Sequence, residues 1–415
     1  MIGKKRNVKN RLEIFCFLKN MVIFAKIYKI KVGMKLKTIV KIGTMVSVLL
    51  FVFAVGYYAF IRLDMTRYNR EFNLFLLVPS SSVGLLEGDK FDAFIAEEST
   101  LNYSRELNGL QFSNLFHFLA NGWREYATEN VHGVNSLLNH WIVSFHGSDL
   151  SRDQVVYFRL GMTDEEVFLD MLRECLPSNF IPKEEMYRGK VMWIYPLSSD
   201  NFLVVYSEQG FMVLSYQKRL LEEVIDAQLD EASLFHDEVF SQILDKKKSH
   251  DFLTLYGRTA SMPLLKTETE CWSEYDIYMN SDVAYLTGDT FFPDGITCQE
   301  ILAEKLQKVP VVKEEGLVLS SQKDSTALYM DQAFEENDIG NGTLFNECVA
   351  SLSNEAAFSL VVDMEKVEKE PERFQMYLPS FVLDHVSLFR SFILSSQFSL
   401  NGGRLSHIWV FTYKY

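Results

Sequence analysis

An uncharged and strongly apolar run, Ile42 to Ile61, constrains this chain more than any other feature. Twenty residues of α-helix span about 30 Å, which is the thickness of the hydrocarbon core of a bilayer. A helix also satisfies its own backbone hydrogen bonds, so it can cross lipid. Tyr57 and Tyr58, near the far end of the run, suit the membrane–water interface. The run therefore predicts a single transmembrane helix over residues 42–61.

Charge gives this helix a direction. Residues 1–41 hold 12 of the 41 Lys and Arg residues but only one of the 55 acidic residues, Glu13. Lys and Arg beside a membrane span stay in the cytoplasm. We therefore predict a basic cytoplasmic segment over 1–41, a linker over 65–71 and an extracytoplasmic or periplasmic domain beyond it. The expected location is the inner membrane, with a single pass.

Two alternatives stay open at the N-terminus. Met34 begins the basic sequence MKLKTIVK, and the Ala-Val-Gly sequence at 54–56 offers small residues for cleavage, so a cleaved signal peptide also fits. The run stays apolar through 57–61, which favours an uncleaved anchor. Residues 1–33 fit either an upstream extension of the gene model or a basic stretch on the membrane surface.

Composition limits what the rest of the chain can be. Apolar residues make up 48% and aromatic residues 14% of the sequence, so the chain is not disordered. Its length of 415 residues leaves room for two external domains. The acidic excess argues against a nucleic-acid partner, because phosphates require a basic surface.

The cysteines do not predict a metal site. Cys16 lies in the basic N-terminal segment, and the other four are widely spaced, with no CxxC pair. We therefore expect no structural zinc and no cofactor. Two disulfides, in any of three pairings, and buried free thiols both remain open for Cys175, Cys271, Cys298 and Cys348.

The remainder of the sequence alternates short strands with helices of moderate length. We predict a strand over 72–79, a helix over 134–145, a hairpin that turns at Gly210, a helix over 218–229, and hairpins at 280–282 and 401–403. Hairpins dominate over βαβ spacing, which is typical of an α+β fold with largely antiparallel sheets and packed helices. A weak internal echo suggests two related units, 72–247 and 248–415.

Three stretches carry a resemblance to a known family. The first stretch, FLLVPSSSVGLLEGDKFDAFI, follows the anchor. The second, residues 202–243, is expected to form a strand, a turn, a strand that ends in Ser215, and a helix with paired leucines. The third, residues 271–292, is expected to form a hairpin. In this order they resemble the uncharacterised bacterial envelope proteins of the DUF3352 type, in Bacteroidetes-like members. The resemblance implies an anchor with an external α+β domain and a cell-envelope setting, and it transfers no site residue.

No motif in the sequence predicts a reaction. His132, His140 and His146 are spaced by eight and six residues, which fits no compact ligand pattern. The sequence SFHGS at 144–148 places two hydroxyl groups beside a histidine, but a polar turn explains it equally well. Acidic doublets suit helix starts and solvated surface; they lie at 97–98, 165–166, 184–185, 222–223, 314–315 and 335–336.

Two hypotheses for function follow. The first is a non-enzymatic, membrane-tethered envelope protein that binds a partner protein or an apolar ligand; Phe-rich stretches at 91–126 and 372–397 are candidates to line an apolar groove. The second is an envelope hydrolase whose site is assembled from dispersed residues such as His132, His146 or an acidic pair. We predict no particular catalytic, cofactor or metal residue.

Overall fold

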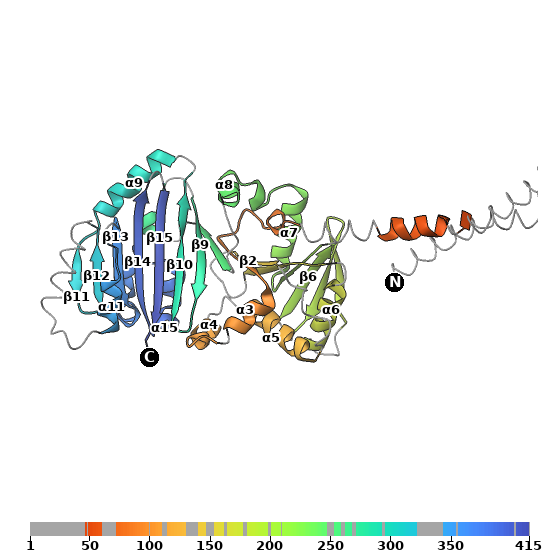
Figure 1. The fold of residues 1–415 in the computed structure, drawn as a ribbon, viewed down its shortest axis with the longest axis horizontal. Coiled ribbons are helices and arrows are strands. Elements are labelled where there is room, and N and C mark those ends of the chain that lie inside the picture. The colour runs from red at the N-terminus through yellow and green to blue at the C-terminus, as the bar shows by residue number, and fades with distance from the viewer. Residues whose placement is uncertain are drawn as a thin grey trace, which may run out of the picture. The chain divides into compact units, whose positions relative to one another are not determined.

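A computed structural model gives the fold (Figure 1). It describes residues 46–47, 49–59, 72–98, 100–109, 114–129, 140–146, 153–161, 164–176, 181–197, 201–208, 210–246, 253–258, 262–267, 271–292, 295–321, 343–353, 356–401 and 404–414. The chain divides into two compact units, Met1–Tyr68 and Asn69–Tyr415. The predicted basic segment 1–41, the predicted linker 65–71 and His132 lie outside the described residues.

The described residues of the first unit, 46–47 and 49–59, are helical. Their apolar side chains are exposed: Phe51, Phe53 and Tyr57 each expose 69% of their surface. Within the described residues, no helix combines the length and the apolar character that a membrane crossing requires. The predicted span, 42–61, extends past the described residues at both ends.

The described strands of the second unit form one 15-stranded sheet in which every neighbouring pair is antiparallel. The strand order is β11-β12-β13-β14-β15-β10-β9-β8-β1-β2-β3-β7-β6-β5-β4. The strands are β1 (Gly84–Asp89), β2 (His140–Phe145), β3 (Gln154–Arg159), β4 (Lys183–Tyr187), β5 (Lys190–Pro196), β6 (Phe202–Glu208), β7 (Phe211–Ser215), β8 (Leu253–Arg258), β9 (Trp272–Met279), β10 (Val283–Phe291), β11 (Val312–Glu314), β12 (Leu317–Ser320), β13 (Phe358–Asp363), β14 (Phe392–Asn401) and β15 (Arg404–Tyr413).

The two sides of this sheet have the same order of strands, counted from the central pair β1–β8. We call residues 72–246 the first arm and residues 253–414 the second arm. In each arm the central strand is followed outward by a hairpin, β2–β3 or β9–β10. A meander then returns from the sheet edge, and its last strand, β7 or β15, pairs with the second strand of that hairpin. The meander has four strands in the first arm, β4–β7, and five in the second, β11–β15.

Side chains of a strand point alternately to the two faces of the sheet. We call face A the side that carries Trp141 and Leu405, and face B the side that carries Tyr256 and Ile408. The helices on face A are α3 (Phe91–Glu98), α5 (Asn114–Glu129) and α6 (Asp164–Cys175) in the first arm, and η5 (Pro263–Leu265), α9 (Gly295–Gln307), α12 (Met364–Lys369), α13 (Pro371–Phe374), α14 (Ser380–Asp384) and α15 (Val386–Phe389) in the second. A short helix, α4 (Ser104–Gly109), contacts α15.

Face B is covered unequally. In the first arm it carries η1 (Leu74–Leu76), α7 (Lys218–Leu229), η3 (Leu234–His236) and α8 (Glu238–Lys246). In the second arm, among the described helices, α8 reaches over Trp272 of β9 and Phe291 of β10, and α11 (Leu344–Ala350) packs against Val318, Val361 and Ile393. The described cores therefore comprise two large clusters on face A, one large cluster on face B that extends from the first arm to Trp272 and Phe291, and a small one under α11.

The predicted α+β class with largely antiparallel strands is confirmed. The helix predicted over 134–145 is wrong over 140–145, where the structure has strand β2, and residues 134–139 lie outside the described residues. All six residues of β2 are buried, so both faces lie inside the protein, and the consecutive apolar residues Trp141–Val143 lack the period of two that marks a half-exposed strand. The strand predicted over 72–79 is also wrong, because Asn73 accepts a hydrogen bond from the Phe75 amide and starts the 3₁₀-helix η1. The boundary predicted at 247/248 falls between α8 and β8, and the sheet continues across it through the β1–β8 pair.

Candidate functional site

The structure brings together two members of the predicted SFHGS motif. Ser144 Oγ lies 2.8 Å from His146 Nε2 and 3.1 Å from the hydroxyl oxygen of Tyr157. Burial lowers the pKa of His146 to about 4, with a smaller contribution from Arg219. A hydrolase would need a substrate to reach this serine, yet Ser144 and Tyr157 expose 0% and His146 4% of their surface. Within the described residues, His146 Nδ1 has no partner that would orient the ring.

A second polar cluster lies on face B at the centre of the sheet, where the two arms meet. His140 Nδ1 lies 2.9 Å from Asp89 Oδ1, and His140 Nε2 lies 3.5 Å from Glu87 Oε1. Tyr256, on the other arm, donates a hydrogen bond of 2.7 Å from its hydroxyl to Glu87 Oε2. Burial, and then the charge of Glu87, raise the pKa of Tyr256 well above its usual value, so the hydroxyl keeps its proton. This cluster ties the arms together.

The acidic doublets do not converge on a common point in the described part of the chain. Some of their members form surface ion pairs: Glu185 with Lys218 (2.5 Å), Glu222 with Lys218 (3.1 Å), Glu223 with Arg219 (2.6 Å) and Glu314 with Arg373 (2.5 Å). Glu98 differs, because its side chain is buried and this burial raises its pKa. The doublet at 335–336 lies outside the described residues. No group of His, Cys, Asp and Glu in the described residues has the arrangement of a metal site.

The cysteines with described side chains are free thiols: Cys175, Cys271 and Cys348. Burial raises the pKa of the Cys175 and Cys348 thiols, which keeps them protonated and unreactive. The side chain of Cys298 lies outside the described residues. The Phe-rich stretches at 91–126 and 372–397 supply core side chains on face A; Phe91 is 0%, Phe374 1% and Phe392 4% exposed.

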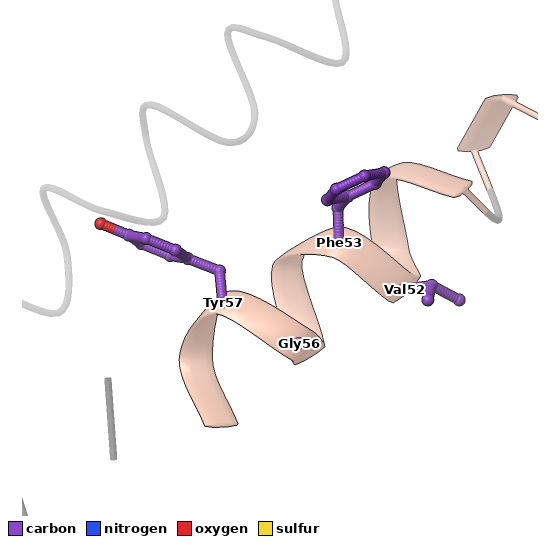
Figure 2. A pocket seen from close by; sticks show the side chains of 4 residues that line it. All are labelled: Val52, Phe53, Gly56 and Tyr57. Carbon is purple, nitrogen blue, oxygen red and sulfur yellow. The ribbon is translucent and has the colours of Figure 1, made fainter. Parts of the chain in front are cut away.

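One small recess lies on the helix of the first unit (Figure 2). It is lined by Val52, Phe53, Gly56 and Tyr57. A Cβ added at Gly56 would meet no atom within 4 Å, so the surface is open at this point. The lining is apolar, so the recess can accept a hydrocarbon group but offers no group for catalysis.

Among the described residues, no core cluster includes the middle of face B over β9, β10, β15 and β14. We call this surface the open face. Its side chains include Tyr278, Tyr285, Ile408 and Val410, and none of these belongs to a buried cluster in the described residues. Tyr278 is 48% exposed, and its ring centroid lies 6.3 Å from that of Tyr285.

The open face mixes apolar and polar groups. Thr287 and Gln397 flank Ile408 in the same register row, and Asp289 lies in the next row, where it accepts a 2.6 Å hydrogen bond from Ser406 Oγ. Sequence reasoning missed this surface, although the alternation in SEYDIYMNSDVAYLTGD held a signal for it: aromatic and polar residues share the side of these strands that the core does not use. A rigid sheet with exposed aromatic side chains is suited to binding rather than to bond-breaking chemistry.

Comparisons with known proteins add little to this geometry. No protein-family model matches the chain, and no curated protein matches it significantly. Among solved structures, the chain is similar to the one titled "Structure of crystal form I of TP0453", with a TM-score of 0.27 and 8% identity, over 58% of this chain and 88% of that chain. The resemblance to envelope proteins of the DUF3352 type stays a prediction.

Proposed function

We propose that the protein is a membrane-tethered extracytoplasmic binding protein, in which an N-terminal helix holds a sheet domain at the outer surface of the inner membrane. The observation that carries the proposal is the helix of the first unit. Phe51, Phe53 and Tyr57 expose most of their surface, and leaving such side chains in water costs about 1.5–3 kcal/mol each. A lipid environment removes this cost, and the uncharged run 42–61 is long enough to provide it.

The flanking charges support the orientation. Basic residues before the run favour a cytoplasmic N-terminus, and the acidic second unit then lies on the other side. The open face supports binding as the role of that unit, because it presents aromatic and β-branched side chains on a rigid frame. The internal polar groups of the sheet are buried, as are Ser144 and His146, so they support stability rather than catalysis.

Fractionation of cells that produce the full chain tests the tether. We expect the protein in the membrane fraction after carbonate washing, and a C-terminal tag should be cleaved by protease added outside the inner membrane. The double substitution Val52→Arg with Val55→Arg should release the protein or abolish its insertion, since each central Arg opposes insertion by about 2.5–3.5 kcal/mol.

The matched control is Ile181→Arg, in the second unit, where the side chain is 90% exposed. This variant should stay in the membrane fraction. Full-length protein in the soluble fraction, or a tag protected until the membrane is opened, would contradict the proposal. The mass of the intact protein separates an uncleaved anchor from cleavage after position 56.

A further inference from the structure

We propose that the open face is the docking site for one amphipathic helix of a partner protein, laid across β10, β15 and β14 at the place where the first arm carries its own helix α7. The inference deepens the proposed function and rests on it, because it names the kind of partner that the tethered domain binds. Three observations carry it: the equivalence of the arms, the position of α7, and the helices α8 and α11 that pack on face B at either side of the open face.

The two arms correspond strand by strand. Strands β1, β2 and β3 correspond to β8, β9 and β10, and the returning strands β7 and β6 correspond to β15 and β14. The helices agree as well. The helix after the hairpin, α6 or α9, packs on face A in both arms. The helix before the central strand, η1 or α8, lies on face B and contacts β3 or β10, respectively. The arms are therefore related about the β1–β8 pair, as expected for a duplicated unit.

Helix α7 breaks this correspondence. It begins shortly after β7 and lies against β7, β6 and β3 on face B. Its inner side chains Leu220, Leu221, Val224 and Ile225 are each 0% exposed. The equivalent place in the second arm is over β15, β14 and β10. Of the described helices, α8 reaches β10 at Phe291 and α11 reaches β14 at Ile393, and neither covers the stretch between them, where the side chains of the open face lie.

The open face is continuous with an interface that the protein already makes with helices. On one side, the α8 side chain Phe240 packs against Trp272 of β9, with ring centroids 5.0 Å apart. On the other side, Cys348 of α11 approaches Thr412 of β15, with the sulfur and the hydroxyl oxygen 3.7 Å apart. Strands are spaced by about 4.8 Å, so the four strands from β9 to β14 span about 14 Å. This width accommodates one helix, about 10 Å across.

The polar residues of the open face indicate a partner that binds reversibly. Under α7, the sheet presents Val213, Met192 and Tyr206, which are fully buried. The open face instead alternates Ile408 and Val410 with polar neighbours and remains partly exposed. A permanent core would be uniformly apolar, whereas a reversible interface is about as polar as ordinary surface. The expected helix carries apolar side chains three and four residues apart, as helices that bind in grooves do.

Site-specific photocrosslinking in intact membranes tests the proposal. The probe is p-benzoylphenylalanine in place of Tyr285 in the full-length chain, and crosslinked peptides are mapped by mass spectrometry. We expect a crosslink to a different protein, at residues spaced three and four apart in an amphipathic helical segment. Adding Ile408→Glu and Val410→Glu should reduce the crosslink at least tenfold, while circular dichroism and membrane retention stay unchanged.

The control places the same probe at Met186, on the edge strand β4 of the first arm, where the side chain is 67% exposed. This site should give no matching crosslink. A crosslink from position 285 to lipid, to the same chain, to a second copy or to an extended segment would overturn the proposal, and so would no crosslink at all. Loss of membrane retention with an intact crosslink contradicts the tether alone, so the two failures are distinguishable.

Discussion

At the residue scale, two glycines in the central strand pair show whether a glycine is required by contact with a neighbouring side chain or by the strand conformation itself. A Cβ added at Gly88 of β1 would lie 2.3 Å from Trp141 Cζ2, which is far inside van der Waals contact. Gly257 has the corresponding place on β8, and a Cβ there would meet no atom within 4 Å. The pair therefore offers a matched experiment, in which the same substitution is made at equivalent positions of one sheet.

We expect Gly88→Ala to lower the free energy of unfolding by about 1–3 kcal/mol, because Trp141 is buried and its ring must shift. Gly257→Ala should be neutral or slightly stabilising, since alanine loses less backbone entropy on folding than glycine does. Chemical denaturation of both variants measures this difference. Equal losses in the two variants would mean that strand geometry, and not Trp141, requires the glycine.

Two buried histidines predict how stability depends on pH. Burial lowers the pKa of His146 to about 4 and that of His407 to about 3, below the usual value of 6.5. The unfolded chain therefore binds protons first on acidification. Their contribution to stability is fully present above pH 6.5 and is lost as the pH falls towards the folded pKa values. The loss amounts to about 1.4 kcal/mol per pH unit for each residue.

Denaturation at pH 7.0, 6.0 and 5.0 tests this dependence. The natural protein should become steadily less stable, and His146→Gln should flatten the slope by about one proton while lowering stability at pH 7. An unchanged slope in that variant would show that His146 is protonated, or solvated, in the folded protein.

At the element scale, sequence patterns predict elements well where particular residues at a turn or at a helix end mark the boundary. The helix predicted over 218–229 is confirmed residue for residue as α7, and the predicted turn at Gly210 is confirmed, with a φ of 98°. The patterns fail where burial removes the contrast between faces. Strand β2 is buried on both faces, because helices cover both sides of the first arm, and its pairing with β1 and β3 decides its conformation. For the open face, the alternation over 273–289 indicates a sheet side with polar and aromatic residues, but it does not show that the described helices leave the middle of that side uncovered.

Helix α7 is expected to be essential to the first arm. Leu221 is fully buried against the sheet, so Leu221→Ala should lower the free energy of unfolding by about 2–5 kcal/mol through lost burial and the cavity that remains. Glu222→Ala, at the next position, should cost about 0–1 kcal/mol, because it removes only the partly exposed ion pair with Lys218. Thermal or urea denaturation compares the two variants. Similar losses would indicate that α7 is held by its surface charges.

At the scale of the whole molecule, the continuous sheet means that the second unit should unfold as one body. The arms share the β1–β8 ladder and the hydrogen bond from Tyr256 to Glu87. Glu87 is buried, so leaving its carboxylate unpaired would be costly.

Tyr256→Phe removes the donor and keeps the ring, so we expect the free energy of unfolding to fall by about 1–3 kcal/mol. Because the lost contact joins the arms, amide exchange should accelerate together in β3 of the first arm and β10 of the second. The control Tyr285→Phe, on β10 itself, removes a hydroxyl that makes no hydrogen bond among the described residues, so it should leave exchange in both strands unchanged. Faster exchange in one arm alone would show that the arms fold independently despite their shared sheet.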